Sequence, residues 1–239
     1  MKLKRKNMFF HFVIIFCVIC SSIDVKAQEK QVSKSLVKLT STEQIPEEIL
    51  TSISTEQLIK VFLNTRYPRY VFFYIDDVSY ALKKAYNDFN GLRELLRRSD
   101  AAGSLIKIYQ GMDPGGYNVN CEPFKKGEYS FTFIFIELLF VYENIHYMLT
   151  ESETKTLLTE LLRKNELKAL HSELYSMVDI KFNTYAIAKL LESKGKYNGI
   201  YEALSQTMST NEFLKSGKVL NKEVLSVVIQ KAKEFLNAN

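Results

Sequence analysis

Beyond its first 27 residues the chain has two histidines and one cysteine, side chains that could bind a metal or carry out nucleophilic chemistry. Glu143 and His146 have the Glu-x-x-His spacing that places two ligands on one helix of a di-iron bundle. That centre needs a second copy of the motif, but the residue three positions before His171 is Lys168. The sequence therefore predicts no metal site and no cofactor.

Cys121 could act as a nucleophile if His146 or His171 lay beside it in the folded protein. Glu122 and Pro123 follow it in a glycine-rich loop, without the helix start that would activate a thiol. The chain also lacks a Gly-x-Ser-x-Gly elbow and a phosphate-binding glycine loop. We predict no catalytic residue, and interpret Cys121 as a partly buried hydrophobic side chain or, alternatively, as a reactive thiol or a partner in an intermolecular disulfide.

Glu137 is the most informative acidic residue, because it interrupts a segment that is otherwise almost entirely apolar. On a continuous helix Ser130, Glu137 and Asn144 recur every seven residues and form one polar line. If this line borders a cleft, desolvation would raise the pKa of Glu137, which could then act as an acid or bind a polar ligand together with the other two residues. The alternatives are that the line faces solvent, or that a buried Glu137 pairs with an arginine or a tyrosine.

Residues 67–74 form the densest aromatic cluster, with five aromatic side chains in eight positions. Exposed aromatic and arginine side chains are the usual anchors of protein interfaces, which makes this cluster a candidate contact surface. The alternative is that the cluster belongs to the core beneath a connecting turn. The candidate partner-binding residues are Tyr67, Arg69, Tyr70 and Phe73.

The element that must position Glu137 is the apolar segment 129–149. A helix that is apolar nearly all round is either a membrane span or the central helix of a folded core. Its acidic residues make spanning costly, by about 2.5–3.5 kcal/mol for a charge at mid-bilayer. We therefore expect residues 129–149 to form one buried central helix, although 129–135 also alternate as a strand would.

Helix signals surround this segment. Capping boxes begin at Ser54 and Thr150, and a 17-residue glycine-rich loop, 111–127, precedes the central helix. The many Lys and Glu residues of 155–168 are expected to form a solvated helix face. The sequence thus predicts an all-α fold, an irregular array of helices packed around residues 129–149. Further helices are expected at 55–65, 101–110, 177–193 and 222–236.

The amino terminus predicts a signal peptide, residues 1–27, with a basic start, a 13-residue apolar run and the small-residue pattern Val25-Lys-Ala27. The apolar run is too short for a membrane span, which needs ~20 residues. An uncleaved anchor and lipidation of Cys20 are the alternatives, and an uncleaved signal would be the chain's membrane contact. We expect a flexible lead-in at 28–41 and a single helical domain at 42–239.

Removing residues 1–27 also removes the basic charge of the chain. These residues carry five of the 32 Lys and Arg and one of the 27 Asp and Glu, which leaves a net charge of +1. A nucleic-acid-binding domain should keep a basic excess, so nucleic acid is not an expected partner. The partner class that remains is another envelope protein or a glycan.

Two segments resemble sequences of a known group. The first is Phe89-Asn-Gly-Leu-Arg-Glu-Leu-Leu-Arg-Arg-Ser-Asp-Ala101, with Lys-x-Tyr at 107–109, and the second is Gly127-Glu-Tyr-Ser-Phe-Thr-Phe-Ile-Phe-Ile-Glu-Leu-Leu139. They are similar to recurring segments of exported helical proteins from Bacteroides-type Gram-negative bacteria, and the resemblance covers roughly residues 42–204. Members often have a longer lead before the proline, where this chain has Arg66-Tyr67.

The group has no assigned activity, so the resemblance implies a helical fold and an exported location but no mechanism. We therefore expect a periplasmic or extracellular protein with a non-catalytic interaction or structural role in the cell envelope. The alternative is an envelope hydrolase or small-ligand-binding protein that uses Glu137 and the 111–127 loop.

Overall fold

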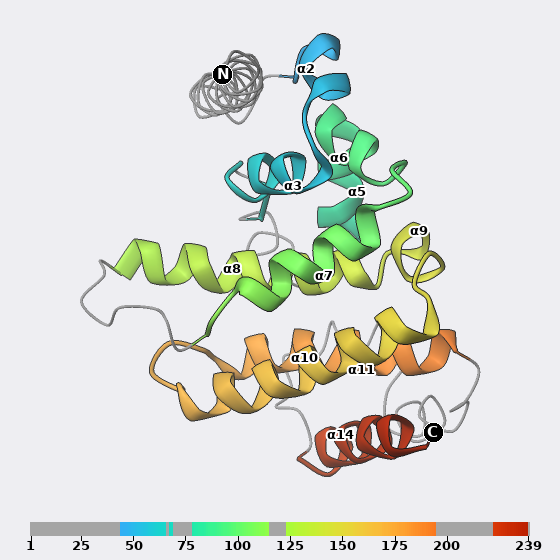
Figure 1. The fold of residues 1–239 in the computed structure, drawn as a ribbon. Helices are drawn as coiled ribbons and strands as arrows, with labels where there is room; N and C mark the ends of the chain where they lie inside the picture. The colour runs from blue at the N-terminus through green and yellow to red at the C-terminus, as the bar shows by residue number, and fades with distance from the viewer. Residues whose placement is uncertain (1–43, 66, 69–77, 115–122, 195–221, 239) are drawn as a thin grey trace, which may run out of the picture. The chain divides into compact units, whose positions relative to one another are not determined.

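The helix that carries Glu137, α8 (Pro123–Phe140), forms the centre of the fold in the computed structural model of the chain (Figure 1). The structure describes residues 44–65, 67–68, 78–114, 123–194 and 222–238. From Phe133 to Phe140 every α8 side chain is at most 2 % exposed, as a central helix requires. The predicted all-α array is confirmed, and these described ranges contain no strand.

The helices expected at 55–65, 101–110, 177–193 and 222–236 begin and end close to the predicted positions. Both capping boxes form, with Ser54 accepting from the Gln57 N–H and Thr150 accepting from the Glu153 N–H. The helices are α2 (Glu47–Ser52), α3 (Thr55–Leu63), α5 (Val78–Asp88), α6 (Asn90–Leu95), α7 (Ala101–Gly111), α9 (Glu143–His146), α10 (Glu151–Leu170), α11 (Met177–Ser193) and α14 (Lys222–Asn237).

The prediction of one helix over 129–149 is wrong at both ends. α8 begins at Pro123, where the missing N–H of proline costs nothing, so the last residues of the expected loop are helical. It ends at Phe140, where the N–H groups of Val141 and Tyr142 bond the carbonyls three residues earlier, at 3.2 and 3.1 Å. The Tyr142 carbonyl then accepts the first hydrogen bonds of α9. No glycine or proline marks this break in the sequence.

Helix α7 lies between the helices that precede it and those that follow it. It packs against α3 on one side, and against α8, α9 and α10 on the other. Helices α10 and α11 pack side by side, and α14 packs against both (Figure 1). The predicted leucine stripe of α10 is buried at Leu157, Leu158, Leu161 and Leu162, whereas Leu170 at the end of the helix is 75 % exposed.

The stretch from Gln44 to Ile53, which we call the strap, lies against the start of α6 through paired amide groups. The Ile45 N–H donates to Asn90 Oδ1 at 2.9 Å, and Asn90 Nδ2 donates to the Ile45 carbonyl at 2.7 Å. The Gln44 side chain repeats the pattern, accepting from the Asn90 N–H at 2.9 Å and donating to the Asp88 carbonyl at 2.7 Å. These four hydrogen bonds imitate a short backbone ladder.

Arg98 holds the far end of the strap. Its guanidinium donates to the carbonyls of Leu50 and Ile53, at 2.6 and 2.9 Å, and to Glu94 at 3.1 Å. These carbonyls stand at the end of α2, where no intrahelical donor remains for them. The polar residues of the 89–101 segment therefore connect helices to one another.

Replacing Arg98 with alanine should destabilise the fold by about 2 kcal/mol, because two carbonyl groups lose a charged donor. The matched control is Arg97→Ala, since Arg97 is an exposed neighbour on the same turn. Urea unfolding followed by circular dichroism measures both variants. Equal midpoints for the two would show that Arg98 does not hold the strap.

Candidate functional site

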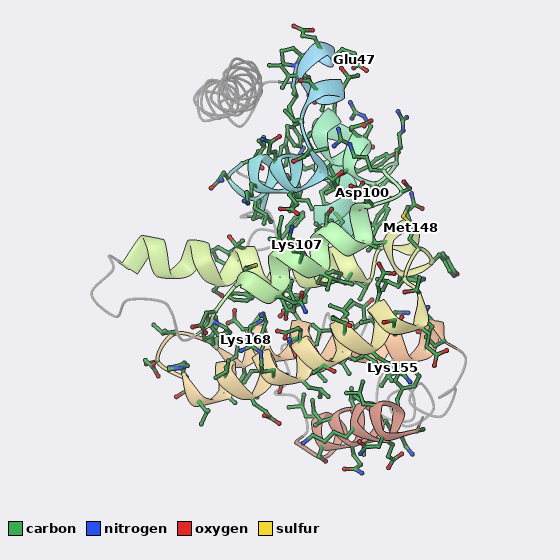
Figure 2. All side chains as sticks on the ribbon, in the orientation of Figure 1. Glu47, Asp100, Lys107, Met148, Lys155 and Lys168 are labelled. Atoms are coloured by element: carbon green, nitrogen blue, oxygen red, sulfur yellow. The ribbon has the colours of Figure 1, made fainter. Side chains whose placement is uncertain are left out.

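Glu137 lies at the centre of a buried polar cluster that joins α7, α8, α10 and α11. Its carboxylate is fully buried, and Lys168 Nζ donates to both oxygens, at 2.7 and 2.9 Å. The Tyr109 hydroxyl donates to Oε1 at 2.7 Å, and Asn183 Nδ2 donates to the same oxygen at 2.9 Å. Figure 2 labels Lys168 on α10, from which it reaches the α8 carboxylate. We call these four residues the Glu137 cluster.

Two lysines of α10 lie on its buried face. Lys164 and Lys168 are both fully buried, although 155–168 was predicted to be a solvated face. Lys164 Nζ lies 4.5 Å above the Tyr109 ring, and Lys168 Nζ lies 5.0 Å from the Phe133 ring centre. Aromatic faces attract desolvated cations, which helps to offset the cost of burial. The prediction fails at these two positions because they continue the leucine stripe by helical steps from Leu161.

The amide of Asn183 is held from its other side. Its Oδ1 accepts from Asn165 Nδ2 at 2.8 Å, and the same Asn165 nitrogen lies 3.3 Å from Thr184 Oγ1. This pair fixes the orientation of the amide, with its nitrogen directed at Glu137. Each polar side chain of the Glu137 cluster thus has a partner, which a buried network needs in order to be tolerated.

Burial and charge shift three pKa values around the cluster. Burial, together with the negative charge of Glu137, raises the pKa of Tyr109 well above its ordinary value of 10.0. Burial lowers the pKa of Lys164 below 10.5, although Glu160 opposes this shift. Burial acts to raise the pKa of Glu160, but hydrogen bonds from Arg163 and Lys164 outweigh it and lower the pKa below 4.5. The surroundings of Tyr109 therefore favour its neutral form.

Tyr109→Phe tests this arrangement through the pH dependence of stability. Removing the hydroxyl should cost about 1–2 kcal/mol near neutral pH, because the Glu137 carboxylate loses a donor. Folding raises the pKa of Tyr109, so its contribution is complete below pH 10 and is lost as the pH rises through the raised value. The stability difference between the wild type and the variant should therefore shrink above pH 10 in urea titrations. A difference independent of pH would contradict the raised pKa.

The predicted polar line is only two residues long. Ser130 and Glu137 both face α11, where Ser130 donates to Asp179 and Glu137 accepts from Asn183. Asn144 is exposed on α9, because α8 has ended before it. The structure does not bring the three candidate ligand-binding residues together. Among the alternatives, the structure has a buried Glu137 that pairs with a tyrosine, Tyr109. Its charged partner is Lys168 rather than the expected arginine.

Tyr67, the one partner-binding candidate that the structure describes, lies in the core. It is 1 % exposed, its ring lies 5.3 Å from that of Phe89, and its hydroxyl donates to the Asp88 carbonyl at 3.1 Å. Arg69, Tyr70 and Phe73 lie outside the described residues, as does Cys121. The core alternative therefore holds for Tyr67, and the surface prediction concerns only the remaining three.

An open groove of about 620 Å³ lies on the surface between α7 and α10. Its lining residues carry hydroxyl, amide and charged groups, and Glu160 connects it to buried Lys164 through a 3.2 Å contact. Sequence patterns did not identify this groove, because its residues come from two separate helices. Its lining residues are Gln110, Glu151, Ser152, Lys155, Thr156, Thr159 and Glu160.

The Glu137 cluster joins four helices through a buried ion pair, and its carboxylate oxygens are occupied by Lys168, Tyr109 and Asn183. In the described parts of the chain, no three His, Cys, Asp or Glu side chains gather as metal ligands would. None of the helices described there has the length and apolar character needed to cross a membrane. The chain matches no protein family, no curated protein and no solved structure.

Proposed function

We propose that this chain is an exported, non-catalytic binding or structural protein of the bacterial cell envelope. The observation that carries the proposal is that the Glu137 carboxylate, the candidate ligand-binding group of the sequence, is already bonded to other side chains of the protein. Its carboxylate accepts hydrogen bonds from Lys168, Tyr109 and Asn183. This arrangement supports a structural role for Glu137 rather than that of an acid presented to a substrate. The signal-peptide pattern of residues 1–27 supports export.

The alternative, an envelope hydrolase or ligand-binding protein that uses Glu137, would require this carboxylate to exchange its present partners for a ligand. Breaking a buried ion pair leaves the Lys168 charge uncompensated, at a cost of ~3–5 kcal/mol. A ligand would have to supply that free energy in addition to its own affinity. The geometry therefore favours the non-catalytic proposal.

The location is tested with the full chain, tagged at its carboxyl terminus and expressed in a Bacteroides-type host. We expect the tag in the periplasmic or extracellular fraction, on a chain that mass spectrometry shows to begin at Gln28. The matched control, Ala27→Arg, should block processing and keep the longer chain with the membrane. Unprocessed wild-type chain in the cytoplasm would refute the export part of the proposal.

The binding role is tested by cross-linking in intact cells, with surface variants beside the wild type. Tyr70→Ala/Phe73→Ala probes the aromatic cluster, and Thr156→Arg places a bulky charge in the α7–α10 groove. A specific cross-linked species that one of these variants loses, at unchanged protein level, supports a contact surface there. Turnover of envelope glycans or peptides by the purified wild type would show that the protein is an enzyme.

A further inference from the structure

The strap depends on a dipeptide that is chemically labile. Asn90 is followed by Gly91, and this is one of two Asn-Gly pairs in the chain, the other being Asn198-Gly199. Glycine has no side chain to hinder its own nitrogen, so in a flexible Asn-Gly pair that nitrogen readily attacks the asparagine side-chain carbonyl.

The fold requires both residues of this pair. Asn90 holds Ile45 through its oxygen and its nitrogen, at 2.9 and 2.7 Å, which only a side-chain amide can do. A Cβ atom on Gly91 would lie 2.5 Å from the Phe89 ring and 2.9 Å from Ile45 Cδ1. The contacts that hold the strap against α6 therefore require the reactive Asn90-Gly91 pair.

We propose that Asn90 is a site of spontaneous deamidation, that the docked strap restrains this reaction, and that its product releases the strap. The Gly91 nitrogen bonds to Asn90 Cγ, and ammonia leaves with a proton taken from that nitrogen. Water then opens the resulting five-membered imide at either carbonyl, giving aspartate or isoaspartate. The only co-reactant is water.

The docked strap restrains the reaction because it fixes the side-chain amide. Both polar atoms of the Asn90 side chain are bonded to Ile45, and Gly91 is held within α6. Attack requires the amide carbonyl to turn toward the Gly91 nitrogen, which breaks both hydrogen bonds. The reaction in the folded protein therefore proceeds through local opening of the strap.

The deamidated residue cannot restore both hydrogen bonds to Ile45. An aspartate at position 90 keeps an acceptor for the Ile45 N–H but replaces the donor nitrogen with oxygen, 2.7 Å from the Ile45 carbonyl. Two acceptors then face each other, and one of them carries charge. Isoaspartate adds a carbon to the backbone, which the first turn of α6 cannot accommodate. The conversion is therefore a one-way release of residues 44–53.

The first test measures deamidation of the full chain at mildly alkaline pH, by mass spectrometry of the peptides that contain the two Asn-Gly pairs. Asn90 should react at least about tenfold more slowly in the folded protein than in the urea-unfolded protein. Arg98→Ala should speed the Asn90 reaction by about tenfold in the folded protein, whereas Arg97→Ala should not. Unchanged circular dichroism of both variants shows that neither has unfolded globally.

The second test examines the product. Asn198→Gln leaves Asn90-Gly91 as the one Asn-Gly pair of the chain. Charge-based chromatography of aged Asn198→Gln protein separates the form that has gained one negative charge, and hydrogen exchange then compares the two forms. Amides of residues 44–53 should exchange at least about tenfold faster in the deamidated form, while those of α8 and α10 stay protected. Equal Asn90 rates in folded and unfolded protein, no acceleration by Arg98→Ala, or an unchanged strap in the deamidated form would each overturn the proposal.

Discussion

Glu137→Leu is expected to lower the free energy of unfolding by about 3–5 kcal/mol, the largest effect of any substitution considered for this chain. The cause is the Lys168 ammonium, which is fully buried and donates to both oxygens of the Glu137 carboxylate. Without the carboxylate its charge has no counter-ion in a region of low polarity. Urea unfolding of purified protein, followed by circular dichroism, measures the loss.

The double variant Glu137→Leu/Lys168→Met separates the stability of the pair from the cost of breaking it. Replacing both partners with apolar side chains of similar size should restore stability to within about 1–2 kcal/mol of the wild type. Tyr109 and Asn183 keep each other as partners, since Asn183 Nδ2 already lies 3.3 Å from the Tyr109 hydroxyl. If the double variant were as unstable as Glu137→Leu, the unpaired charge would not be the cause.

Gly91→Ala is expected to destabilise the fold by about 1–3 kcal/mol, through overpacking. The new methyl group would meet the Phe89 ring at 2.5 Å, and this ring cannot withdraw because it is stacked on Phe62 and packs at a tilt against Tyr67. Ile45 is 2 % exposed and equally confined. Thermal unfolding measures the effect as a lower midpoint temperature.

Gly111→Ala is the matched control for this substitution. Gly111 is the last residue of α7, and a Cβ atom there would meet nothing within 4 Å. Alanine should therefore stabilise the protein by about 0.5–1 kcal/mol, because it loses less backbone entropy on folding. The opposite signs of the two substitutions test the packing argument, and a stabilising Gly91→Ala would contradict it.

Helix positions could be predicted because their signals are local. A capping box needs only four adjacent residues, and those at Ser54 and Thr150 form as expected. Apolar spacing likewise identified the buried leucines of α10. The end of α8 at Phe140 could not be predicted, because no glycine, proline or cap residue marks it and the turn depends on packing against other helices.

The partners of Glu137 were hidden for a related reason. Lys168 and Tyr109 are 31 and 28 residues away in the sequence, and a lysine on a charged helix ordinarily faces solvent. The usable signal was the position of Lys164 and Lys168 on the leucine face of α10. Asn183 gave a weaker signal, as a lone amide within the largely apolar face of α11.

The Glu137 cluster also has a consequence for how the molecule opens. Each of α7, α8, α10 and α11 contributes one of its four members, so detaching any one of these helices strands a charge or a polar group in the interior. These four helices should consequently unfold as a single cooperative unit, and their amide hydrogens should exchange only through global unfolding. Helix α14 packs on them mainly through apolar contacts and the Lys233–Glu166 ion pair, so it can unfold locally while the other helices stay folded.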